Sequence, residues 1–159
     1  MSAEAILTLA RAQGLKLAAA ESCTGGLIMA ALTEVPGSSD VVDRGFVTYS
    51  NVAKIEMLGV LSETLATHGA VSEEVAREMA QGALARSSAD LAVSVTGIAG
   101  PGGSEFKPEG RVCFGLARRS GVQSETIEFG AIGRGNVRAA TVTHALQLLE
   151  RALAGWTGR

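Results

Sequence analysis

Segments with helical spacing of apolar residues alternate with short apolar runs along the chain, and this alternation narrowly limits its fold. The helical patterns cover residues 3–13, 24–34, 51–58, 72–88 and 135–154. The short apolar runs, typical of buried strands, cover residues 15–20, 41–49, 90–97, 110–119 and 122–130, and Ser120-Gly121 joins the last two as a hairpin. Strands interleaved with helices usually form a sheet that is covered on both faces. The sequence therefore predicts an α/β fold, a three-layer α/β/α sandwich around a mixed, mostly parallel sheet.

The length and composition fit a single folded domain spanning residues 1–159. A chain of this length buries roughly 70% of the surface that it exposes when unfolded. Hydrophobic residues make up 47% of the chain and charged residues 19%, so we expect a packed core rather than a disordered tail.

Several classes of protein are disfavoured by the sequence. Its N-terminus has no basic stretch followed by an apolar run, and no apolar segment reaches the ~20 residues of a membrane span. The net charge of −2 and the 4% of aromatic residues disfavour binding to nucleic acid. Cys23 and Cys113 are too few and too far apart for a disulfide scaffold or a zinc site. We expect a cytoplasmic protein with no nucleic acid and no membrane partner.

Three loops rich in polar residues and glycine each follow an apolar strand. Their sequences are "ESCTGG" (21–26), "TYSNVAK" (48–54) and "TGIAGPGGSEFKPEG" (96–110). In open α/β sheets, ligands collect at the carboxyl ends of the strands. We therefore expect the three loops to line one pocket.

Ser22 lies in the first loop, where a strand ends and a helix begins. A hydroxyl that attacks a carbonyl there would have oxyanion donors nearby, with the N–H groups of Thr24, Gly25 and Gly26 as candidates. The spacing alone favours a simpler role, in which Ser22 or Thr24 caps the helix. Cys23 is more typical of a small buried core residue than of a nucleophile.

A serine nucleophile needs a base, and Lys54 is a better candidate than either histidine. His68 lies in a connection and His144 in the last helix, so neither belongs to the three loops. Lys54 follows Tyr49 and Asn51 by about one helical turn, which would place all three on one pocket wall. Its pKa would have to fall from about 10.4 to roughly 7 or 8 for this role. The alternative is a solvated helix lysine.

The third loop carries four glycines around Pro101, at positions 97, 100, 102 and 103, and matches neither the dinucleotide-binding fingerprint nor the Walker A loop. Its glycines would let backbone N–H groups converge on an anion. Lys107 in the loop, together with Arg134 and Arg138 at the start of the last helix, would add positive charge. The alternative is a mobile surface loop.

The three loops, with "GSSDVVDRGFVTYSNVAK" and "HGAVSEEVAREMAQGAL", resemble the CinA C-terminal domain family from about residue 15 to the last helix. Its characterised members are nicotinamide mononucleotide deamidases. The resemblance implies a three-layer α/β/α fold that hydrolyses nicotinamide mononucleotide to nicotinic acid mononucleotide and ammonia, without a metal or an organic cofactor. It also implies self-association as a homo-oligomer. Larger relatives carry an additional N-terminal domain, so we expect this chain to lack the pyrophosphatase-like activity of that domain.

The resemblance also implies roles for individual residues. Ser22 is the nucleophile, Lys54 is its activating base, and the Tyr49 hydroxyl helps proton transfer or orientation. Together, the loops and the resemblance give the expected substrate-binding residues, which are Thr24, Gly25, Gly26, Asn51, Thr96, Gly97, Gly100, Gly102, Lys107 and Arg138.

One segment departs from the family pattern. Relatives often have "KPVGTV" where this chain has "KPEGRV" (107–112), so Glu109 and Arg111 replace a small apolar residue and a threonine. The role of Lys107 is open for that reason. A second function also stays open, a module that binds a phosphorylated nucleotide without chemistry, and ammonia release would separate the two.

Overall fold

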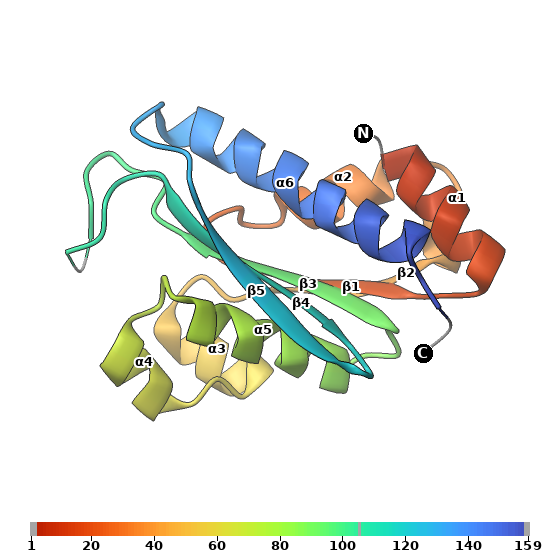
Figure 1. The fold of residues 1–159 in the computed structure, drawn as a ribbon, viewed down its shortest axis with the longest axis horizontal. Helices are drawn as coiled ribbons and strands as arrows, with labels where there is room; N and C mark the ends of the chain where they lie inside the picture. The colour runs from red at the N-terminus through yellow and green to blue at the C-terminus, as the bar shows by residue number, and fades with distance from the viewer. Residues whose placement is uncertain (1–2, 105, 158–159) are drawn as a thin grey trace.

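The computed structural model describes residues 3–104 and 106–157 and contains a five-stranded sheet in the order β2-β1-β3-β4-β5 (Figure 1). The strands are β1 (Leu17–Glu21), β2 (Val42–Val47), β3 (Leu91–Gly97), β4 (Arg111–Arg118) and β5 (Gly121–Glu128). Strand β1 pairs in parallel with β2 and β3, whereas β4 pairs antiparallel with β3 and β5. Within the described residues, β4 alone runs against the other strands, which confirms the predicted mixed, mostly parallel sheet.

Helices cover both faces of this sheet, as the alternating pattern predicts (Figure 1). One layer contains α1 (Ala3–Gln13), α2 (Leu27–Thr33) and α6 (Arg134–Ala154). The other contains α3 (Asn51–Leu58), α4 (Ser62–His68) and α5 (Glu73–Ala85). The short 3-10 helix η1 (Ser38–Asp40) precedes β2. No helix among the described residues is both long enough and apolar enough to cross a membrane.

The interior strand β1 separates two apolar layers, and all of its residues are buried. Leu17 and Ala19 belong to the core beneath α1, α2 and α6, while Ala18 and Ala20 belong to the core beneath α3 and α5. The alternation follows from the two-residue period of a strand. The small alanine side chains let the helices lie close to the sheet.

Gly82 fixes the position of α3 on α5. A side chain at Gly82 would overlap the main-chain carbonyl of Leu58 at the end of α3, so glycine is required for this close approach. Leu58 and Met79 are fully buried between the two helices and the sheet. The contact holds α3, which carries Lys54, against the rest of the fold.

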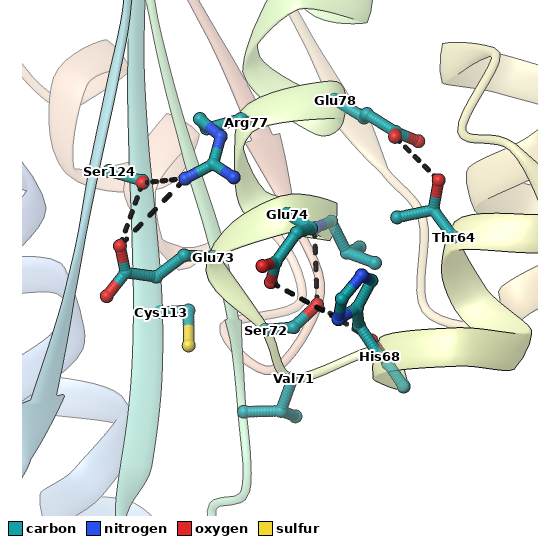
Figure 2. Close-up of polar contacts among 12 residues, drawn as sticks. Thr64, His68, Val71, Ser72, Glu73, Glu74, Arg77, Glu78, Cys113 and Ser124 are labelled. Carbon is teal, nitrogen blue, oxygen red and sulfur yellow. Dashed lines mark hydrogen bonds and ion pairs between the residues drawn. The ribbon is translucent and has the colours of Figure 1, made fainter.

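Strand β5 is held to α5 by polar contacts (Figure 2). The Ser124 hydroxyl donates to a Glu73 carboxylate oxygen at 2.9 Å, and Arg77 donates to the Ser124 oxygen at 2.7 Å. Nearby, His68 lies 3.8 Å from the Glu74 carboxylate. Strand β5 is an edge strand, as its polar sequence predicts.

The structure corrects three details of the sequence analysis. His68 ends helix α4 instead of lying in a connection, and α4 escaped prediction because none of its residues is buried. The hairpin turn is formed by Arg119 and Ser120, since Gly121 already belongs to β5. Helix α2 begins at Leu27 rather than at residue 24, because two glycines with positive φ, Gly25 and Gly26, form a turn before it.

Candidate active site

The three polar loops meet at the carboxyl ends of β1, β2 and β3, where they line one cavity of about 470 Å³. The three strands are neighbours that run in the same direction, so their ends share one edge of the sheet. The residues that line the cavity are Ser22, Cys23, Tyr49, Asn51, Lys54, Ala70, Val71, residues 96–104 and Arg134. This is the single pocket that the sequence predicts.

Ser22 and Lys54 are in direct contact in this cavity. The Lys54 Nζ atom lies 3.0 Å from Ser22 Oγ and 3.0 Å from the main-chain oxygen of Thr48. Ser50 begins α3 as its N-cap by accepting a hydrogen bond from the Ala53 N–H. That cap places Lys54 in the first turn of α3, from which its side chain reaches the end of β1. Residues 32 positions apart in the chain are thereby brought together.

Lys54 is a buried lysine without an acidic partner. Its exposed fraction is 1%, and the ion pairs among the described residues do not include it. Burial lowers the pKa of Lys54 from its ordinary value of 10.5, because desolvation disfavours the charged ammonium. A lysine that loses its proton more easily suits the role of a base. The burial of its side chain excludes the alternative of a solvated helix lysine.

Glu21 is a central residue of this region that the sequence analysis missed. Its carboxylate is fully buried, and one of its oxygens accepts hydrogen bonds from the Thr24 hydroxyl at 2.5 Å and from the Ile28 N–H at 3.0 Å. The other oxygen accepts from the Met29 N–H at 3.0 Å. Glu21 therefore caps α2, the role that the spacing had favoured for Ser22 or Thr24. Glu21 lies six residues before the first residue of α2, so no capping pattern in the sequence pointed to it.

The occupied N–H groups correct the expected oxyanion donors. The Gly25 N–H donates to the Ser22 carbonyl at 3.1 Å, and the Gly26 N–H donates to the Glu21 carboxylate at 3.1 Å. Both groups are already engaged, so neither is free to hold an oxyanion. In this turn, the N–H groups of Cys23 and Thr24 are the remaining candidates.

Arg134 joins the second and third loops at the cavity. Its Nη1 atom donates to the Gly100 carbonyl at 2.7 Å, and its Nη2 atom donates to the Tyr49 hydroxyl at 3.1 Å. The Tyr49 hydroxyl is thus bonded to Arg134, while the Tyr49 main-chain oxygen lies 3.5 Å from Lys54 Nζ. The cavity wall contributes the Arg134 guanidinium as an accessible positive charge.

Arg138 and Lys107 hold the loops from outside the cavity. Arg138 donates to the carbonyl oxygens of Cys23 and Thr24 at 3.0 and 3.3 Å. Lys107 donates to the carbonyl oxygens of His68 and Val71, both at 2.6 Å, and so ties the third loop to the end of α4. Both cations are engaged by main-chain oxygens.

The expected substrate-binding residues divide into two groups. Asn51, Thr96, Gly97, Gly100 and Gly102 line the cavity. The Thr96 hydroxyl already donates to the Ala70 carbonyl at 2.9 Å. The residues that do not line it are Thr24, Gly25, Gly26, Lys107 and Arg138.

Cys23 lies beside Ser22 in the cavity wall. Burial raises the pKa of its thiol to about 11, so the thiol stays protonated near neutral pH. Among the described residues, no group of three or more His, Cys, Asp or Glu side chains is arranged to hold a metal ion.

The sequence of this chain is similar to that of a known protein family. The model of the CinA C-terminal domain family matches residues 1–153. A CinA-like protein of Chloroherpeton thalassium is 61% identical over 72% of this chain, and one of Mycobacterium sp. (strain JLS) is 51% identical over 88%. The chain spans only 27% and 34% of the length of these two curated relatives.

Solved structures extend the comparison to three dimensions. The competence/damage inducible protein CihA from Agrobacterium tumefaciens is 56% identical, with a TM-score of 0.91 over 96% of this chain and 93% of that one. The competence damage-inducible protein A from Klebsiella pneumoniae is 41% identical, with a TM-score of 0.91 over 98% of both chains. On this evidence the chain belongs to the CinA C-terminal domain family.

Proposed function

We propose that this chain is an amidohydrolase that converts nicotinamide mononucleotide to nicotinic acid mononucleotide and ammonia. The observation that carries the proposal is the 3.0 Å contact between Lys54 Nζ and Ser22 Oγ in a cavity of about 470 Å³. A hydroxyl beside a buried lysine with a lowered pKa is the arrangement that a serine nucleophile needs. The names of the relatives concern competence and damage and state no reaction, so the reaction rests on this geometry and on the resemblance.

The proposed reaction begins with Lys54 in its neutral form. Its amine takes the proton of the Ser22 hydroxyl while Oγ attacks the carboxamide carbon, and the C=O electron pair moves to the oxygen. N–H groups of the turn that follows Ser22 stabilise this oxyanion. As the C–N bond breaks, protonated Lys54 returns the proton to the leaving nitrogen, which departs as ammonia. Water then repeats these steps on the acyl-enzyme and releases the carboxylic acid.

Arg134 is the proposed contact for the substrate phosphate. Its guanidinium lies at the cavity, whereas Arg138, the contact implied by the resemblance, donates to two main-chain carbonyls of the first loop. In the proposed site Arg138 positions the nucleophile loop. Asn51 and the lining glycines would contact the ribose and the ring.

The test is to incubate the purified chain with nicotinamide mononucleotide and measure ammonia and nicotinic acid mononucleotide together. We expect equal amounts of the two products. The second function, a module that binds a phosphorylated nucleotide without chemistry, predicts a raised melting temperature with the nucleotide and no ammonia. That outcome would overturn the amidohydrolase proposal.

The proposal also covers the location of the protein in the cell and its self-association, which rest on the sequence and on the resemblance. We place the protein in the cytoplasm and expect it to self-associate as a homo-oligomer. Light scattering coupled to size-exclusion chromatography would measure the molar mass, and a value equal to that of one chain would contradict self-association.

A further inference from the structure

The Glu109 side chain bridges two parts of the third loop and lies outside the cavity lining. Its carboxylate oxygen Oε1 accepts the Gly102 N–H at 2.7 Å. Its side chain also packs against Gly100, where an added Cβ would lie 2.6 Å from the carboxylate carbon and from Oε2. Gly100 and Gly102 both line the cavity, whereas Glu109 does not. A carboxylate therefore lies just behind the glycines that were expected to hold an anion.

The charge of Glu109 is not balanced by an ion pair. The ion pairs among residues 3–104 and 106–157 do not include Glu109. The neighbouring cation, Arg134, donates to the Gly100 carbonyl from the cavity side. Lys107, two residues before Glu109, is engaged by the His68 and Val71 carbonyls. The glycine loop thus has a cation on its cavity side and an anion behind it.

This arrangement changes what the glycine loop can bind. A loop recognises a phosphate when several of its N–H groups point at the anion. Here the Gly102 N–H is already used by a carboxylate, and the negative charge of that carboxylate repels a second anion nearby. A substrate phosphate that contacts Arg134 in the same cavity lacks the Gly102 N–H as a donor, and the Glu109 carboxylate repels it.

We propose that Glu109 is a specificity-determining residue that weakens the preference of the site for a phosphorylated nucleotide over the corresponding riboside. The inference rests on the proposed function for the identity of the two ligands, nicotinamide mononucleotide and nicotinamide riboside. Both carry the same cationic pyridinium ring and the same ribose, so they differ only in the phosphate. Glu109 acts on the phosphate through the loop and touches neither the nucleophile nor its base.

The test compares the affinities of the two ligands for Ser22→Ala with those for Ser22→Ala/Glu109→Gln. The Ser22→Ala background prevents turnover, so calorimetry measures binding alone. Glutamine keeps an oxygen for the Gly102 N–H and removes the charge. We expect the ratio of dissociation constants, riboside over mononucleotide, to rise about three- to tenfold, because only the mononucleotide loses a charge repulsion.

Glu34→Gln in the same background is the matched control. Glu34 is exposed at the end of α2, which runs away from the cavity, and its replacement changes the net charge by the same amount. We expect the ratio to stay unchanged in this variant. A ratio that rises equally in both variants would reduce the effect to net charge and overturn the proposal.

Other outcomes separate this proposal from the proposed function. If Glu109→Gln changes both affinities by the same factor, Glu109 only supports the loop and the specificity role is wrong, even where the wild type releases ammonia. If the wild type releases no ammonia and the ratio still rises, the specificity role holds in a binding module. If neither ligand binds and the wild type releases no ammonia, both proposals are overturned; if neither ligand binds to the Ser22→Ala variants while the wild type releases ammonia, only the specificity role is overturned.

Discussion

Lys54 is a buried lysine whose described partners are all neutral oxygen atoms. They are the Ser22 hydroxyl and the main-chain oxygens of Thr48 and Tyr49. A carboxylate partner would have held the pKa of the lysine up, whereas burial without one lowers it. The same surroundings that make Lys54 costly to bury make its neutral form accessible as a base.

Cys23 is expected to be dispensable for turnover. Burial raises the pKa of its thiol to about 11, so the reactive thiolate is scarce near neutral pH. Cys23→Ala should keep the rate of ammonia release within about threefold of wild type, since a buried free cysteine acts chiefly as a small apolar residue. A loss of several hundredfold, with the melting temperature unchanged, would favour Cys23 as the nucleophile.

At the residue scale, the sequence supplies candidates but not their contacts. Ser22 and Lys54 could be selected because polar residues at strand ends are visible in the pattern. Arg134 and Arg138 lie one helical turn apart, and no spacing rule separates the one at the cavity from the one behind the first loop. Glu21 was missed because its role requires knowing that the turn at Gly25 and Gly26 folds back over it.

Helix α2 depends on a buried carboxylate at its N-terminus. The N–H groups of Gly26, Ile28 and Met29 all donate to Glu21, which comes from the preceding strand. The strand, the turn that carries Ser22 and the helix are therefore one connected unit. Displacing Glu21 would move the nucleophile as well as the helix.

Glu21→Gln should destabilise the fold by about 2–4 kcal/mol, because the amide group turns one acceptor oxygen into a donor that faces an N–H. Urea unfolding gives the change in the free energy of unfolding. Glu128→Gln is the control, since Glu128 is half-exposed and pairs with Arg111 at 2.7 Å, and its loss should cost at most about 1 kcal/mol. Equal costs in the two variants would contradict the role of Glu21.

At the element scale, a helix can be predicted from the sequence when its buried residues recur at helical spacing. Helix α5 was recognised from Ser72, which accepts the Val75 N–H as a cap, and from its buried stripe. Helix α4 leaves no such pattern, because none of its residues is buried. The fold class followed from the alternation of elements, while the exact ends of α2 and of the hairpin depended on turns.

At the scale of the whole molecule, the burial of Lys54 makes the free energy of unfolding depend on pH. The pKa of Lys54 in the folded state lies below 10.5, so between these two values the unfolded chain binds more protons than the folded one. Stability therefore rises with pH in that window. The folded protein bears the full desolvation cost below the lowered pKa.

Replacement of this lysine by methionine, which cannot be charged, should remove this pH dependence of the free energy of unfolding. Relative to Lys54→Met, the wild type should gain free energy of unfolding as pH rises from below the lowered pKa of Lys54 toward 10.5. Urea unfolding of both proteins at a series of pH values measures the difference. A difference that is constant with pH would mean that Lys54 titrates as an ordinary lysine.

The most direct test of the Ser22–Lys54 centre is the rate of ammonia release from nicotinamide mononucleotide by wild type, Ser22→Ala and Lys54→Ala, with Glu34→Gln as the control. Loss of a nucleophile or its base typically costs several orders of magnitude, so we expect a fall of about 10³-fold or more in both variants and wild-type rates in the control. Circular dichroism would show that the variants are folded. Turnover that persists near the wild-type rate in folded Ser22→Ala or Lys54→Ala would contradict the account.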